Sequence, residues 1–151
     1  MRYIFLIFCM FLCSACVPAP HSYTETPRVS GTVTKNGVPL SGATVLISDE
    51  FDDDVCSMAA KTTTTDADGR FKLSKTRGFG LFITMGDHLY SNQLCIKTAD
   101  KTYIGYSRKE IGYPPKSIKL KCDINTKSIT VDEKRSKAGI DQLAVCTVVK
   151  D

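Results

Sequence analysis

The stretch 31-GTVTKNGVPLSGATV-45 decides the fold class. Asn36-Gly37 supplies residues that tolerate positive φ, and Pro39 has a fixed φ, so we predict a tight chain reversal near residue 37. On both sides of this turn every second residue is small or apolar, which is the periodicity of a half-buried β-strand. The alternating residues are Val29, Gly31 and Val33 before the turn, and Ala43, Val45 and Ile47 after it.

The same pattern recurs along the rest of the chain, broken by Gly, Asn, Asp and Pro. A second turn is predicted at Asp66-Ala-Asp68-Gly69, where Asp side chains and Gly favour a reversal. About nine or ten strands result, which predicts an all-β sandwich of two packed sheets. The further alternating sets are Phe71/Leu73, Phe79/Leu81/Ile83/Met85, Leu94/Ile96, Ile104/Tyr106, Ile118/Leu120/Cys122, Ile129/Val131 and residues 143–149.

Two motifs in this order, residues 31–45 and Thr65-Asp66-Ala-Asp68-Gly69-Arg-Phe71, resemble a prealbumin-like (transthyretin-like) domain of the carboxypeptidase-regulatory type. The resemblance covers about residues 28–74. It implies a β-sandwich used as an adhesion, carbohydrate-binding or assembly module, and it implies no particular chemistry. From about residue 75 no further motif is found.

The first fifteen residues, MRYIFLIFCMFLCSA, combine one basic residue with an apolar run that ends on small residues, as in a secretory signal peptide. Leu12-Cys13-Ser14-Ala15-Cys16 resembles a bacterial lipobox, although Cys13 stands where such sequences usually have Leu and Leu12 lies one position earlier. We predict lipidation of Cys16, with ordinary cleavage after Ala15 as the alternative. By the same resemblance, Val17 after the cysteine implies an outer-membrane anchor on the periplasmic side.

This leader sets the predicted domain organisation: a signal peptide at 1–15, a lipidated tether at 16–27 and one sandwich domain at 28–151. Residues 17–27, VPAPHSYTETP, are Pro-rich, polar and without periodicity, which predicts an irregular tether.

Four of the seven cysteines lie in the domain, at Cys56, Cys95, Cys122 and Cys146. An even number in an exported chain predicts two disulfides, for which three pairings are possible. We prefer Cys56–Cys95 with Cys122–Cys146, on the assumption that neighbouring segments pair. A zinc site is disfavoured because the four cysteines form no close pair, and a catalytic thiol because no evident base lies near one.

Catalytic groups are scarce, and the chain has only two histidines, His21 and His88. Asp87-His88 is interpreted as a charged turn, and no Gly-x-Ser-x-Gly elbow accompanies it. The C-terminus lacks the Tyr-Arg-Gly-Ser ending of hydroxyisourate hydrolases, which are prealbumin-like enzymes. The positions that follow Asp66 do not continue a calcium loop. We therefore predict no enzyme, no metal and no cofactor.

Charge is distributed unevenly along the chain. Residues 49–54 hold five acids, including Asp52, Asp53 and Asp54; a solvated loop is the default interpretation, and calcium or a basic partner is the alternative. Residues 97–121 are basic, which favours steering toward a complementary protein or anionic headgroups. They include Tyr103 and Tyr106, candidate anchors for a protein partner. Nucleic acid fits poorly, because removal of Arg2 leaves 19 basic against 16 acidic side chains.

These features predict a non-enzymatic lipoprotein facing the periplasm that binds a protein partner. The preferred assignment is an immunity or inhibitor protein against a delivered toxin such as a type VI secretion lipase. An assembly component of an envelope or secretion machine is the alternative. A carbohydrate or cell-wall binding module is a third, disfavoured by the absence of Trp. An enzyme would require a functional His88.

Overall fold

The computed structural model describes residues 16–48, 56, 59, 61–84, 89–125 and 145–149. These residues form strands and turns, and none of them belongs to a helix that is long and apolar enough to cross a membrane. The strands are β1 (Cys16–Thr24), β2 (Arg28–Lys35), β3 (Val38–Pro39), β4 (Thr44–Ser48), β5 (Lys61–Thr64), β6 (Arg70–Leu73), β7 (Arg77–Thr84), β8 (Leu89–Lys97), β9 (Thr102–Ile111), β10 (Ser117–Ile124) and β11 (Cys146–Val148).

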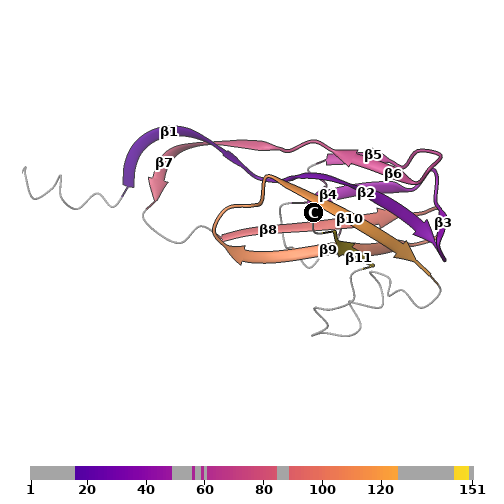
Figure 1. Cartoon of the computed structure of the whole chain (residues 1–151). Helices are drawn as coiled ribbons and strands as arrows, with labels where there is room; N and C mark the ends of the chain where they lie inside the picture. Colours follow the sequence, from indigo (N-terminus) through magenta and orange to yellow (C-terminus); the bar gives the residue numbers. More distant parts are fainter. Residues whose placement is uncertain are drawn as a thin grey trace, which may run out of the picture.

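Two open sheets make up the body of the molecule, which confirms the predicted all-β sandwich (Figure 1). The first follows the order β11-β10-β2-β3, and β6 also pairs with β2. The second follows the order β5-β4-β8-β9. All pairings are antiparallel except that of β2 with β10, which is parallel and in register from Arg28 and Ser117 onward.

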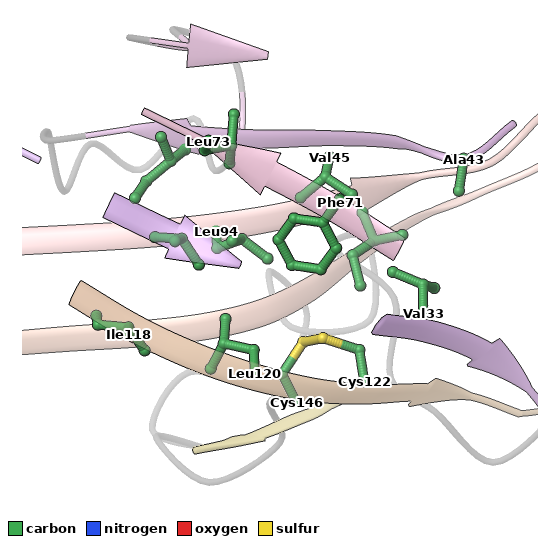
Figure 2. Close-up of a cluster of buried hydrophobic side chains, with 13 residues drawn as sticks. Val33, Ala43, Val45, Phe71, Leu73, Leu94, Ile118, Leu120, Cys122 and Cys146 are labelled. Carbon is green, nitrogen blue, oxygen red and sulfur yellow. A yellow bond between two sulfur atoms is a disulfide. The ribbon is translucent and has the colours of Figure 1, made fainter. Parts of the chain in front are cut away.

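The core lies between the two sheets and is built from the alternating residues of the sequence (Figure 2). On β10 the residues Ile118, Leu120 and Cys122 are buried, while the residues between them face outward. Each fully buried large apolar side chain stabilises the fold by about 1.5–3 kcal/mol. Beside them in the same sheet lie Val29, Val33, Phe71 and Leu73, and across the core lie Val45, Ile47, Leu94 and Ile96 of the other sheet.

Both predicted turns are present. Asn36 and Gly37 have φ values of 52° and 80° and form a two-residue hairpin loop between β2 and β3. At the second turn, the Asp66 carboxylate accepts hydrogen bonds from the backbone amides of Asp68 and Arg70, at 3.0 and 2.8 Å. Gly69 adopts a φ of 71° there.

The two disulfides have the preferred pairing, Cys56–Cys95 and Cys122–Cys146. Cys122 and Cys146 face each other across β10 and β11, and both belong to the core cluster (Figure 2). Gly105 makes room for this bond, because a Cβ at that position would lie 3.0 Å from the Cys146 sulfur. Cys95 is fully buried in β8, and its disulfide attaches the segment that contains Cys56 to the second sheet.

The irregular tether predicted for residues 16–27 differs from the structure, in which Cys16–Thr24 form strand β1 paired with β7. This β1–β7 ribbon, hereafter the arm, continues the β2–β6 pair beyond the body of the sandwich (Figure 1). Strand β1 forms because β7 supplies its hydrogen-bonding partners. Its own sequence has no strand periodicity, so the sequence alone did not indicate a strand there. Thr26 and Pro27 are buried where the arm meets the body.

The strand predicted around Ile129 and Val131, and the parts of the predicted strands that contain Met85 and residues 143–144, lie outside the described residues.

Candidate partner-binding surface

The end of the sandwich opposite the arm carries a groove of about 500 Å³. The end of β2, the loop that precedes β4, the β8–β9 connection and the end of β10 meet there (Figure 1). Its main side chains are those of Lys35, Leu40, Asp100, Lys101, Tyr103 and Ile124. We call this feature the distal groove.

One wall of the distal groove is held by Thr65, a residue that is only 4% exposed. The Thr65 hydroxyl donates a hydrogen bond to the Leu40 carbonyl at 2.7 Å and accepts one from the Ala43 amide at 2.9 Å. The Gly42 amide also donates to the Thr65 carbonyl, at 3.1 Å. These bonds fix the 40–43 loop before any partner arrives.

The opposite wall is the tight β8–β9 connection. The Thr98 amide donates a hydrogen bond to the Lys101 carbonyl at 2.8 Å, and the Lys101 amide donates to the Thr98 hydroxyl at 3.1 Å. Lys101 and Asp100 are exposed at its tip, and Tyr103 is half-buried beside them. The groove therefore has an apolar floor, with Leu40 and Ile124, and a charged rim.

A partly apolar floor with a charged rim suits an inserted side chain or peptide segment of a partner, since buried aromatic anchors dominate interface energies and rim charges steer the encounter. Within the described lining, Lys35, Asp100, Lys101 and Tyr103 are the titratable groups, and no histidine or cysteine accompanies them. Among all described residues, no group of three or more His, Cys, Asp or Glu side chains is arranged to hold a metal ion.

The structure separates the two tyrosines predicted as anchors. Tyr103 lines the distal groove. Tyr106 packs against the core cluster and is half-buried within β9. Asp52, Asp53 and Asp54, the other predicted partner-binding residues, lie outside the described residues, as does His88.

The basic stretch 97–121 does not form one patch. Lys101 lies at the distal groove, while Lys119 and Lys121 occupy the outward positions of β10. Near the arm end, Arg108 donates to the Glu110 carboxylate at 2.6 Å, and the Tyr90 hydroxyl donates to the same oxygen at 3.2 Å. The Arg108 hydrogen bond lowers the pKa of Glu110, and burial raises the pKa of Tyr90.

Cys16, the predicted lipidation site, is the first residue of β1 and pairs with Thr84 at the outer end of the arm. His21 lies on the arm, at the end opposite the groove, with its Nδ1 atom 3.0 Å from the Ala19 carbonyl oxygen. The sequence did not reveal the groove, because its lining comes from segments that are distant in the sequence, and none of these segments carries a binding motif.

Alternation of apolar residues predicted the strand β7, but it did not show that Phe79 and Leu81 are exposed.

Comparison with known families matches residues 29–127 to a family described as a domain of unknown function, DUF6795. The match spans β2 to β10 and thus nearly the whole described sandwich, without the arm strand β1. No curated protein matches the chain.

Proposed function

The chain belongs to DUF6795, a family of domains of unknown function, and from its site we propose that it is a non-enzymatic lipoprotein facing the periplasm that binds a protein partner in the distal groove. The single observation that carries the proposal is the placement of this preformed groove at the end of the sandwich opposite Cys16. An acyl anchor on Cys16 holds the protein at the outer membrane and leaves the groove facing away from it.

The composition of the groove supports a protein ligand. Tyr103 offers an aromatic contact beside Leu40 and Ile124, and Lys35, Asp100 and Lys101 supply a charged rim. Tyrosine combines a large apolar face with a polar tip and is enriched among the residues that dominate binding energy. The resemblance of residues 28–74 to prealbumin-like domains belongs to the same proposal, since such domains serve as adhesion or assembly modules.

The preferred partner is a delivered toxin, such as a type VI secretion lipase, for which this chain acts as the immunity protein. The two disulfides, which form and persist in oxidising compartments, fit the predicted periplasmic location. The acidic segment 49–54 favours the immunity assignment, because it supplies negative charge for contact with a basic target. An assembly role in an envelope or secretion machine is the alternative, and neighbouring genes that encode a toxin or a secretion cluster separate the two.

The test is affinity capture with the full chain and two charge-reversal variants. Lys101→Glu alters the rim of the distal groove, whereas Lys119→Glu makes the same change on an exposed outward position of β10. We expect Lys101→Glu to reduce partner recovery and Lys119→Glu to leave it unchanged. Capture that both variants reduce equally, or measurable glycan binding with no protein partner, contradicts the proposal.

A further inference from the structure

Exposed apolar side chains gather at the arm end of the molecule. Phe79 and Leu81 on the arm are 67% and 58% exposed. Leu89, where β8 begins, and Ile111, where β9 ends, are 55% and 68% exposed and form a cross-strand pair. The loop that follows Ile111 carries Tyr113, which is 74% exposed. Figure 1 shows that these strand ends point in the direction in which the arm projects. Isolated exposed apolar residues are ordinary, but a gathering at one end indicates a contact surface.

The two faces of the arm differ in how they are covered. Tyr23 pairs with Gly78, and a Cβ on Gly78 would lie 2.5 Å from the Tyr23 ring. His21 pairs with Gly80 in the same way, at 2.8 Å from its ring. The two rings therefore cover the glycines on one face. On the other face, Arg77, Phe79 and Leu81 occupy alternate positions, and all three are exposed.

The position of the proposed acyl anchor indicates what covers this second face. The arm ends at Cys16, which becomes the lipidated N-terminus once the proposed leader 1–15 is removed. The part of the chain that meets the membrane is thus covalently joined to the outer end of the arm, about 30 Å of strand from the body at 3.3–3.4 Å per residue.

Charge at the same end is consistent with a phospholipid surface. Arg77 lies beside Phe79 and Leu81 on the exposed face, and Arg28 and Lys116, both exposed, meet where β2 and β10 begin. Basic side chains near a membrane are attracted to anionic headgroups, and aromatic side chains are enriched at the interface.

From these observations we infer that the arm is a membrane-contacting element: its Phe79 and Leu81 face lies in the interfacial region of a phospholipid bilayer. The inference rests on the proposed anchor at Cys16 and adds a second contact to it. The acyl chains on Cys16 hold the protein at the bilayer, and a protein contact beside them orients it. In this orientation the distal groove points away from the bilayer.

Because the chain contains no Trp, a single introduced Trp reports its own surroundings. Phe79→Trp probes the arm, and Val38→Trp is the matched control, since Val38 is 66% exposed at the opposite end of the sandwich. Each variant is prepared as the full lipoprotein and reconstituted into vesicles of phosphatidylethanolamine and phosphatidylglycerol, with and without lipids brominated on their acyl chains.

We expect the emission of Phe79→Trp to shift to shorter wavelength in vesicles and to be quenched by the brominated lipids, while Val38→Trp shows neither change. Leu81→Trp provides a second probe of the same face if Phe79→Trp does not fold. Absence of quenching at both arm positions, or equal quenching at Val38→Trp, overturns the inference. The mass of the N-terminal peptide distinguishes the causes. An acylated Cys16 with an unquenched arm refutes the arm contact alone, whereas an unmodified Cys16 with an unquenched arm refutes the arm contact and the anchor together.

Discussion

Asn92 is a polar residue in the core-facing row of β8, two positions before Leu94. It is 1% exposed, and neither its amide nitrogen nor its amide oxygen has a hydrogen-bond partner in the described part of the chain. A buried polar group without a partner costs about 1–3 kcal/mol relative to a satisfied one. Sequence periodicity placed Leu94 and Ile96 in the core but could not show that the row extends to Asn92.

Asn92→Leu is therefore expected to raise the free energy of unfolding by about 1–2 kcal/mol, because Leu has the branching of Asn and removes both unsatisfied groups. Urea denaturation followed by circular dichroism measures the change. Asn92→Asp is the contrasting variant and should destabilise, since a charge replaces a neutral amide in the same buried place. If Asn92→Leu lowers stability, then either the amide has a hydrogen-bond partner or the site cannot accommodate the larger side chain.

Elements with local chemistry could be predicted from the sequence, and elements defined by their partners could not. Asn36-Gly37 specifies the β2–β3 turn by its own conformational preferences, and alternating burial makes β10 recognisable. By contrast, the sequence of β1 has no apolar alternation. It is a strand because β7 provides the hydrogen-bonding partners and two glycines over which Tyr23 and His21 lie. Such pairing depends on residues about sixty positions away.

The edge strand β11 illustrates how a covalent bond supports a short element. It has three residues, of which Cys146 is buried, and the Cys122–Cys146 disulfide connects it to β10. We expect the double variant Cys122→Ala/Cys146→Ala to lose about 2–4 kcal/mol of stability, since the bond closes a loop with a sequence separation of 24.

Thermal unfolding with and without a reducing agent measures this loss. In the wild-type chain reduction should lower the Tm, and in the double variant reduction should lower it less, because the Cys56–Cys95 bond alone remains. Equal effects of reduction in both proteins would show that the β10–β11 bond contributes nothing to stability.

Over the whole molecule, two surfaces lie at opposite ends of one sandwich. The distal groove is formed by connections between strands, and the arm is formed by the extension of β2 and β6 beyond the sheet. The compact core between them, with fully buried Val33, Val45, Leu94 and Ile96, keeps their separation fixed. Tyr103 could be predicted from the sequence as a binding residue. The groove around it could not, because Lys35, Leu40 and Ile124 come together only in the fold.

This separation predicts that attachment and partner binding can be abolished independently. Cys16→Ser should release the protein from membranes in cell fractionation and leave its affinity for the partner unchanged, because Cys16 is at the outer end of the arm.

Tyr103→Ala should leave the protein in the membrane fraction and weaken partner binding by roughly ten- to thirtyfold, the usual effect of removing an aromatic anchor. Tyr113→Ala, an exposed tyrosine at the arm end, is the control for partner binding. A Cys16→Ser protein that stays in the membrane fraction contradicts the lipid anchor. A Tyr103→Ala protein with unchanged affinity contradicts the groove, and because the two measurements use different variants and readouts, either part of the proposed function can fail without the other.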